Sequence, residues 1–400
     1  MPPKLHPVLI QAVVTGLISI FADNRYADKA IEYLLKSNPK WGARDRAFIA
    51  ETMYDMVRNW RLLWFLAAKE VDLQQDSLYK LFGIYWLYKG NILPNWDIFK
   101  NVQLRKSIED AQKIPAVFHS FPDWLVAMLE ADLGNQSLTE MAALNQQAQV
   151  VLRVNTLKKS KKELKALFAQ ENIETAEIPL YPDALLLQKR QNIFANPLFQ
   201  KGFFDIQDAG SQAIAAFAEV EAGMRVIDAC AGAGGKSLHL AALMQNKGRI
   251  ISMDVEEKKL TELKRRASRA GASIIETRLI ESSKTIKRLA DTADRVLLDV
   301  PCSGIGVIRR NPDAKWKLSP TFIQEVQVKQ SEILQSYSRM LRVGGTLTYA
   351  TCSILSAENR QQIQAFLQQN GDKYELLAEK SILPSDGFDG FYMAKMQRRS

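Results

Sequence analysis

At 400 residues the chain is long enough for two or three domains of roughly 100–200 residues each, and its formal net charge of +9 fits either a polyanionic partner or a solvated basic surface. Three cysteines without metal-type spacing and three scattered histidines argue against a disulfide scaffold, a zinc site and histidine-centred catalysis. No apolar run reaches the length of a membrane span and no cleavable leader is recognisable, so we expect a cytosolic protein with reduced thiols and no metal ion.

Residues 1–120 have helical periodicity and predict an all-α bundle. The clearest piece reads RAFIAETMYDMVRNWRLLWFLA, and we interpret the apolar face of this helix as core. The face consists of Ile49, Met53, Met56, Val57, Trp60 and Trp64. Arg58 and Arg61 lie outside it, where they either contact RNA or are solvated.

Residues 121–205 predict a small linking α/β module. Pro115 and Pro122 flank a plausible boundary, a further helix follows, and VVLRVNTLKKSKKELKALFAQENI is typical of a strand followed by a basic helix. ALLLQ and GFFDIQD predict two more strands. The lysines of the basic segment either follow a phosphate backbone or belong to a solvated turn, and the sequence favours neither. They are Lys158, Lys159, Lys161 and Lys162.

From residue 206 to residue 400 strands and helices alternate. The expected strands are VIDAC, RIISMD, SIIETRL, RVLLDVPC and GTLTYATCS, and EEKKLTELKRRASRAG is one of the helices between them. This alternation predicts a doubly wound α/β domain with a mainly parallel sheet, in which ligands gather at the carboxyl ends of the strands.

The loop DACAGAGGKSLH, which starts at Asp228, predicts an adenosine-type ligand. A phosphate-binding P-loop requires glycine where this chain has Cys230, and the third glycine of a dinucleotide fingerprint is replaced by Ser237. The surrounding strand, turn, helix and strand nevertheless form a nucleotide-binding unit. Its second strand ends in Asp254, which is placed to hold a pair of ribose hydroxyls.

Two of the three cysteines occupy matching positions, each directly after an expected strand. Cys302 follows RVLLDVP and Cys352 follows GTLTYAT, so both belong at the edge that carries the nucleotide loop. A single free cysteine is most often a small buried hydrophobic residue. Two cysteines at matching positions, one in a Pro-Cys-Ser-Gly turn and one in a Thr-Cys-Ser turn, favour a catalytic role.

The motifs DACAGAGGKS, LLDVPCSGIGVIRRNPDAKW and YATCSILSAEN resemble the signatures of the Sun-type RNA cytosine-5 methyltransferases. Residues 1–120 resemble the NusB-like RNA-binding domain of antitermination factors, and LRVNTLK and DIQDAGSQ resemble the segment that precedes the catalytic domain in this family. The combination resembles the branch that modifies 16S ribosomal RNA. The resemblance implies a Rossmann-like catalytic domain at 206–400, S-adenosylmethionine as cofactor and RNA as partner, and we expect a monomer.

The resemblance also implies the roles of three catalytic residues. Cys352 is expected to add to carbon 6 of cytosine as the nucleophile, which converts the ring into an enamine able to take a methyl group at carbon 5. Cys302 is expected to assist release of the adduct after the proton on carbon 5 leaves. Asp299, which closes an apolar strand, is expected to contact N3 and the exocyclic amine and to deliver a proton to the ring.

For the cofactor, the resemblance implies that the glycine loop wraps the methyl donor through backbone amides while Lys236 contacts its carboxylate. The family commonly has Ala-Pro where this chain has Gly232 and Ala233, a change that keeps the other glycines. The acid after the third strand corresponds to Glu281, with an alignment uncertain by one residue. The expected cofactor residues are Cys230, Ala231, Gly232, Ala233, Gly234, Gly235, Lys236, Asp254, Glu281 and Asp299.

RNA contacts are expected in the linking module and after the Pro-Cys turn, where the side chains either hold flanking RNA or brace the site. The target base must be unstacked to reach the thiol, which fits single-stranded or loop RNA. Transfer RNA remains an alternative substrate, a non-catalytic RNA-binding assembly factor is a second alternative, and a redox role of the cysteines is a third. The expected RNA-binding residues are Arg153, Asn155, Arg309, Arg310 and Lys315.

Overall fold

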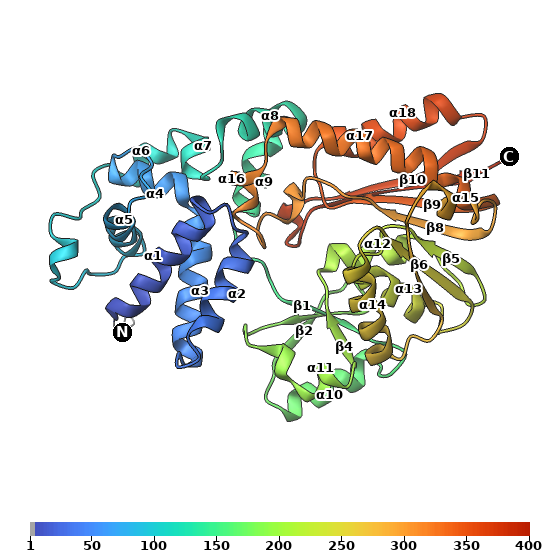
Figure 1. The fold of residues 1–400 in the computed structure, drawn as a ribbon, viewed down its shortest axis with the longest axis horizontal. Coiled ribbons are helices and arrows are strands. Elements are labelled where there is room, and N and C mark those ends of the chain that lie inside the picture. The colour runs from blue at the N-terminus through green and yellow to red at the C-terminus, as the bar shows by residue number, and fades with distance from the viewer. Residues whose placement is uncertain (1–4) are drawn as a thin grey trace. The chain divides into compact units, whose positions relative to one another are not determined.

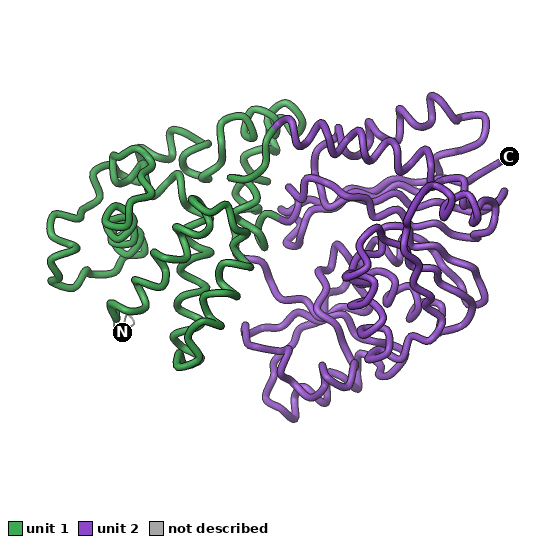
Figure 2. The backbone as a smooth tube through the Cα atoms, in the orientation of Figure 1, with its two compact units in different colours: residues 1–146, 308–319 green, residues 147–307, 320–400 purple. Residues whose placement is uncertain are grey.

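The computed structural model describes residues 5–400 and consists of two compact units (Figures 1 and 2). The first, called here the helical unit, comprises the chain up to residue 146 together with residues 308–319. The second, called here the sheet unit, comprises residues 147–307 and 320–400. No helix among residues 5–400 combines the length and the apolar character that crossing a bilayer requires.

The helical unit is all-α, and the predicted apolar face forms its core. All six side chains predicted for that face are at most 4% exposed, which confirms the interpretation as core. Arg58 is buried as well, and its guanidinium donates to the carbonyl of Arg309 at 3.1 Å. The helices are α1 (Pro7–Phe21), α2 (Ala27–Ser37), α3 (Ala43–Arg58), α4 (Trp60–Ala67), α5 (Gln75–Tyr88), η1 (Asp97–Phe99), α6 (Ile108–Gln112), α7 (Pro115–Phe118), α8 (Asp123–Leu133), η2 (Gly134–Gln136), α9 (Ser137–Leu144) and α16 (Ala314–Lys317).

The boundaries of the units differ from the predicted domains in two ways. The helical unit extends past residue 120 to residue 146, because Arg61 donates to the carbonyl of Phe121 at 2.7 Å and its backbone N–H bonds Ser120 at 2.8 Å. It also contains residues 308–319, which are distant in sequence. Within that segment the indole of Trp316 donates to the carbonyl of Val57 at 2.8 Å.

The linking module is a four-stranded antiparallel sheet inside the sheet unit, with strand order β2-β3-β1-β4. The predicted strands and the basic helix are all present. The helix begins with a capping box, in which Ser160 and Glu163 satisfy each other's backbone N–H groups. The elements are β1 (Val151–Val154), α10 (Lys161–Gln170), β2 (Thr175–Glu177), β3 (Ala184–Leu187), η3 (Ile193–Ala195), α11 (Pro197–Gln200) and β4 (Phe204–Ile206).

The main sheet has seven strands in the order β10-β11-β9-β8-β5-β6-β7, and β5 to β9 are the five predicted strands, paired in parallel. β11 runs antiparallel between β9 and β10, an extension that the sequence analysis did not name. The strands are β5 (Arg225–Asp228), β6 (Arg249–Asp254), β7 (Ile275–Leu279), β8 (Ala293–Asp299), β9 (Leu341–Thr351), β10 (Tyr374–Ile382) and β11 (Phe391–Arg398).

Helices cover both faces of this sheet, which confirms the doubly wound α/β class (Figure 1). Successive strand residues alternate between two apolar clusters, as the two-residue period of a strand requires, and Leu297 and Leu298 belong to opposite clusters. One cluster includes side chains of α15, α17 and α18, and the other includes side chains of α12, α13 and α14. These helices are α12 (Ala209–Phe217), α13 (Gly235–Leu243), α14 (Glu257–Ala270), α15 (Ser283–Lys287), α17 (Pro320–Tyr337) and α18 (Arg360–Asn370).

Candidate active site

The carboxyl ends of four neighbouring parallel strands carry the predicted site residues. The glycine loop follows β5, Asp254 ends β6, Asp299 ends β8, and Cys352 follows β9. Since β9, β8, β5 and β6 are consecutive in the sheet, these residues lie along one edge. Cys302 follows β8 by three residues and meets Cys352 there.

The glycine loop adopts a conformation that requires glycine at two positions. Gly232 has φ +53° and Gly234 has φ +85°, both in the left-handed region. A Cβ on Gly234 would lie 2.4 Å from Cγ of Leu263, whereas one on Gly232 would meet nothing within 4 Å. The N–H of Gly232 donates to Oδ2 of Asp254 at 2.9 Å, and Oδ1 of Asp254 accepts from the N–H of Glu256 at 2.9 Å. Asp254 thus fixes the loop while its carboxylate retains further lone pairs.

Asp228 is a site residue that was not among the predicted ones. It ends β5, is fully buried, and accepts a hydrogen bond from Ser237 at 2.6 Å on Oδ2, while its Oδ1 has no partner. Burial raises the pKa of Asp228 to about 7. A buried, orphaned acceptor beside the glycine loop suits a cationic amino group. Its signal in the sequence was the acid that closes the first strand directly before the loop.

Lys236 and Asp299 form an ion pair across the site, with Nζ 2.6 Å from Oδ2. Burial opposes the charge on Lys236, but Asp299, assisted by Cys352 and Asp228, outweighs it and raises the pKa of the ammonium. One N–H of the Lys236 ammonium is therefore bonded to Asp299, and a contact with a ligand would use another. Oδ1 of Asp299 has no hydrogen-bond partner in the described part of the chain and remains an acceptor at the strand edge.

The two predicted catalytic sulfurs are in contact, with Sγ of Cys302 2.7 Å from Sγ of Cys352. The backbone N–H of Cys352 also donates to the Cys302 sulfur at 3.2 Å. Hydrogen bonding to Cys352, followed by burial, raises the pKa of the Cys302 thiol well above its ordinary value. Burial and nearby carboxylates do the same for Cys230, so that Cys302 and Cys230 both stay protonated near neutrality.

One buried carboxylate, that of Glu358, holds the two cysteine turns together. Glu358 is fully buried and accepts from the N–H of Ser303 at 2.7 Å, from the hydroxyls of Ser303 and Ser353 at 2.5 Å each, and from the amide of Gln330 at 3.0 Å. Each serine directly follows one of the cysteines. The serine that follows each of these cysteines therefore has a structural role, which the sequence analysis did not predict.

Gly306 supplies a second link between the turns. Its N–H donates to the carbonyl of Cys352 at 3.0 Å, and its carbonyl accepts from Gly390 at 2.8 Å. A Cβ at this position would lie 2.2 Å from the carbonyl oxygen of Gly390 and 2.8 Å from that of Cys352. No side chain fits here without moving the Cys352 turn.

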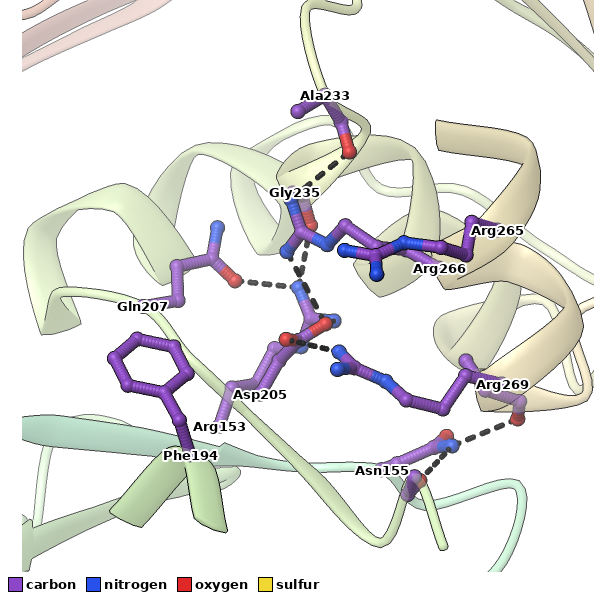
Figure 3. A network of polar contacts seen from close by, with 12 residues as sticks. Arg153, Asn155, Phe194, Asp205, Gln207, Ala233, Gly235, Arg265, Arg266 and Arg269 are labelled. Atoms are coloured by element: carbon purple, nitrogen blue, oxygen red, sulfur yellow. Dashed lines mark hydrogen bonds and ion pairs between the residues drawn. The ribbon is translucent and has the colours of Figure 1, made fainter. Parts of the chain in front are cut away.

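Arg153, predicted to bind RNA, is instead a buried brace beneath the glycine loop (Figure 3). It is 3% exposed, and its guanidinium donates to the carbonyl of Gly235 and to the side chain of Gln207 at 2.5 Å each. Asp205, its neighbour across the strand pair, lies 3.8 Å away. The side chain cannot present its charge to RNA from this position.

Two arginines of α14 complete the network in Figure 3. Arg266 donates to the carbonyl of Ala233 at 2.9 Å and to Asp205 at 3.2 Å, and Arg269 donates to Asp205 at 2.8 Å. Asn155, also predicted to bind RNA, is 7% exposed, and its amide donates to two backbone carbonyls at 2.8 Å each. The linking module thus carries a polar network that supports the cofactor loop, and Asn155 has no free polar surface.

Arg309 and Lys315 are likewise corrected from RNA contacts to internal braces of the helical unit. Arg309 is 3% exposed and donates to the carbonyl of Ala143 at 3.1 Å. Lys315 is fully buried, and its ammonium donates to the carbonyl of Arg58 and to Asn145 at 2.8 Å each. Burial lowers the pKa of Lys315 well below its ordinary value. Because both side chains are buried, neither presents its charge to RNA.

The two remaining predicted residues differ in exposure. Arg310 is partly exposed, and its role as an RNA contact stays a prediction. Glu281 is exposed just beyond the end of β7, next to Ile280, whose N–H donates to the carbonyl of Asp254 at 2.9 Å. It thus lies at the same sheet edge. Within residues 5–400 no three His, Cys, Asp or Glu side chains gather as a potential metal site.

Comparison with known proteins decides the family. Residues 215–397 match the model described as 16S rRNA methyltransferase RsmB/F, and residues 121–194 match the ferredoxin-like domain of RsmF/B-like methyltransferases. A Yersinia enterocolitica ribosomal RNA small subunit methyltransferase B is 35% identical over 89% of this chain and 91% of its own. A probable enzyme of the same name from Synechocystis is 31% identical over 87% and 86%. The chain belongs to the RsmB/F methyltransferase family.

Solved structures agree with this assignment at the level of the fold. PH0851 is similar over 99% of both chains with a TM-score of 0.83 and 22% identity. A methyltransferase homologue from Pyrococcus horikoshii is 26% identical, with a TM-score of 0.64 over 74% of this chain and all of its own. NSun6 from the same organism, solved with SFG, has a TM-score of 0.65 over 70% of this chain and 99% of its own, at 19% identity. The fold of this chain is therefore shared with these solved structures.

Proposed function

We propose that this methyltransferase transfers a methyl group from S-adenosylmethionine to carbon 5 of a cytosine in 16S ribosomal RNA, through a covalent bond between Cys352 and carbon 6. The observation that carries the proposal is the contact of two thiols, Cys302 and Cys352, beside the ion pair of Lys236 and Asp299 at the sheet edge. The relatives named small subunit methyltransferases B support the substrate. A cytoplasmic location remains a prediction from the sequence.

The residues around the glycine loop fit the methyl donor. The orphaned Oδ1 of Asp228 is an acceptor for the amino group, and the carboxylate of Asp254 has lone pairs left for the ribose hydroxyls. A Cβ on Gly232 would meet nothing within 4 Å, so the loop has open space beside its backbone for the donor. S-adenosylmethionine, when bound, supplies an electrophilic methyl group on a sulfonium.

The thiol states support the division of labour between the cysteines. Hydrogen bonding to Cys352 and burial raise the pKa of the Cys302 thiol, so that Cys302 holds its proton near neutrality. Cys352 is the sulfur that we assign to the bond with carbon 6. Oδ1 of Asp299 accepts from the exocyclic amine of the base and orients the ring for this attack.

The second half of the reaction restores the aromatic ring. Carbon 5 loses its proton to a base at the site, the electron pair of that C–H bond forms the ring double bond, and the bond between Cys352 and carbon 6 breaks with its electrons returning to sulfur. We assign Cys302 to this release, because its sulfur lies 2.7 Å from that of Cys352, where a protonated Cys302 can donate to the departing thiolate. Without Cys302 the adduct should persist.

The test is to trap that adduct. Cys302→Ala is incubated with S-adenosylmethionine and total RNA from the source cell, run on a denaturing gel, and the attached RNA is sequenced. An adduct that disappears when Cys352→Ala is added supports the mechanism and identifies the target, including transfer RNA if that is what is found. Cys230→Ala, a matched loss of one thiol that leaves both catalytic sulfurs, should trap nothing.

The alternatives give different results in the same experiment. A non-catalytic assembly factor would bind RNA, form no adduct and transfer no methyl group even as wild type. A redox protein would lose two free thiols on mild oxidation and would show no dependence on S-adenosylmethionine. Methyl transfer by wild type together with an adduct that forms equally in Cys302→Ala and in the Cys302→Ala, Cys352→Ala double variant would contradict the assignment of the nucleophile.

A further inference from the structure

A cavity of about 200 Å³ lies in the helical unit, and none of its lining residues belongs to the catalytic proposal. It is formed by α4, α5 and the segment 100–105 that follows η1. Cavities of about 150 Å³ already hold a benzene ring, so that a single flat ring fits inside. The lining residues are Trp64, Ala67, Lys69, Ser77, Lys80, Leu81, Ile84, Lys100, Asn101, Val102, Gln103 and Arg105.

The inner wall of this cavity is apolar and contains one unsatisfied donor. Trp64, Leu81 and Ile84 are each at most 4% exposed. The indole N–H of Trp64 is buried and has no acceptor among the residues that the structure describes. Leaving such a buried donor unpaired destabilises the folded protein. A ligand with an acceptor on a flat ring would remove this cost.

The rim of the cavity is basic. Lys69, Lys80, Lys100 and Arg105 line it and are exposed, and no Asp or Glu is among the lining residues. Lys100 pairs with Asp97 at 2.8 Å. Lys80 and Arg105 have no ion-pair partner within the described chain, which leaves two cations for an anionic ligand.

Lys69 contributes less to the rim than these two cations. It lies near Asp72, whose pKa is lowered mainly by a hydrogen bond from Ser77 and also by the charge of Lys69. Lys69 is therefore partly neutralised by a carboxylate outside the cavity lining.

Contacts within the helical unit hold the walls of the cavity in place. The N–H of Arg105 donates to the carbonyl of Leu66 at 2.8 Å, which anchors the segment to the end of α4. A Cβ on Gly83 of α5 would lie 2.9 Å from Cγ1 of Val102 and 3.2 Å from Cδ1 of Phe99, so this glycine allows the segment to pack closely on the helix. A preformed cavity binds without the entropic cost of ordering a loop.

We propose that this cavity holds one nucleotide of the RNA strand, with the base against Trp64 and Leu81 and its phosphate between Lys80 and Arg105. The inference rests on the proposed function, which makes RNA the substrate. The apolar wall and the basic rim match the two halves of a nucleotide, and stacking of a base on an aromatic side chain stabilises single-strand binding whatever the base. An acidic peptide would match the rim but would leave the ring-sized interior unfilled.

The test measures RNA binding by the full-length protein, without methyl transfer. The probe is a single-stranded oligonucleotide of 16S sequence carrying 4-thiouridine, which is crosslinked by light and mapped by mass spectrometry. The double variant Lys80→Glu, Arg105→Glu should lose at least about tenfold in affinity and reduce the slope of log K against log salt by about 0.7, the contribution of one phosphate contact on a single strand.

A matched control reverses two other lysines of the same unit, as Lys36→Glu and Lys113→Glu. Their side chains are 75% and 72% exposed and they do not line the cavity. This control should lose less than about threefold in affinity, because it changes only the long-range field. Crosslinks of wild type that map to residues 64–105 support the proposal. Equal losses in both double variants, or crosslinks only elsewhere, overturn it.

Competition separates an RNA strand from a free nucleotide. Cytidine monophosphate at the concentration of the oligonucleotide should not reduce the crosslink, whereas equal competition would make this a nucleotide site and overturn the assignment to a strand. Inorganic phosphate should compete even less, since it lacks the ring. The catalytic proposal is tested separately. If Cys302→Ala forms no adduct, the catalytic proposal is wrong, while the crosslink at the cavity is unaffected.

Discussion

Replacing Glu358 by Gln should separate the two cysteine turns without removing either thiol. The amide oxygen keeps the bonds from the N–H of Ser303 and from Gln330, while the NH₂ group now faces the two serine hydroxyls, which must rotate to accept. Since hydrogen bonds to a charged group contribute about 1.5–3 kcal/mol and neutral ones about 0.5–1.5 kcal/mol, losing the charge on two to four short contacts should cost about 2–4 kcal/mol of unfolding free energy. The contacts lie between 2.5 and 3.0 Å.

The effect on catalysis should exceed the effect on binding. A displacement of about 1 Å in a reacting group costs on the order of 100-fold in rate, so kcat for methyl transfer should fall by about that factor while KM for RNA stays within about threefold. Bridging of Cys302 to Cys352 by dibromobimane reports the separation of the sulfurs directly and should slow in the variant. The structure places these sulfurs 2.7 Å apart.

Glu276→Gln is the matched control for the same chemical change in the same unit. Its carboxylate is 39% exposed and pairs with Arg278 at 2.7 Å and with Arg249, and exposed pairs of this kind contribute about 0–1 kcal/mol each. Equilibrium unfolding in urea, the methyl-transfer rate and the bridging rate are measured for both variants. If Glu358→Gln leaves the methyl-transfer rate and the bridging rate at wild-type values, the carboxylate does not position the thiols and the reasoning is refuted.

Three further changes test other parts of the site. Gly306→Ala, whose Cβ would lie 2.8 Å from the carbonyl of Cys352, should lower the rate of adduct formation in the trapping assay by at least about tenfold, and an unchanged rate would show that the turn adapts. Arg153→Met should weaken the binding of S-adenosylmethionine, measured by calorimetry, by about tenfold or more, because Gly235 loses a buried charged donor; undiminished cofactor affinity would restrict Arg153 to stability. Asp228, with its pKa raised to about 7, holds a proton in the folded state that the unfolded state releases near pH 4, so stability should fall as pH rises from 4 to 7, by up to about 1.4 kcal/mol per pH unit. In Asp228→Asn this part of the pH dependence should disappear, as measured by urea unfolding at several pH values. A pH profile identical to that of wild type would contradict the role of Asp228.

The parallel strands and the loops at their carboxyl ends were predictable because both depend on local sequence. Continuous apolar runs such as RVLLDV are typical of strands buried on both faces, and parallel pairing brings their ends to one edge. Asp254, Asp299, Cys302 and Cys352 were placed at that edge by chain position alone, and the structure brings them together there. The antiparallel β10 and β11 were not predicted, since β10 is a half-exposed edge strand with a mixed polar pattern.

The burial of three basic residues was not predictable from the sequence. Arginine and lysine are residue types that commonly contact RNA. Arg153, Arg309 and Lys315 are nevertheless buried, and each donates to a backbone carbonyl. A cation can be buried only where acceptors converge on it, and here those acceptors come from residues 82, 166 and 257 positions away in the chain. Sequence patterns carry no record of such partners.

The sequence by itself determined which strands form, which loop is rich in glycine, and which strand ends carry thiols and acids. Only the tertiary structure decided how these are held. It places one carboxylate, Glu358, between the serines of two turns 50 residues apart, and it assigns residues 308–319 to the helical unit rather than to the domain that precedes and follows them. The physical reason is that strand formation and turn geometry depend on neighbouring residues, whereas burial of a charge depends on partners that meet only after the chain has folded.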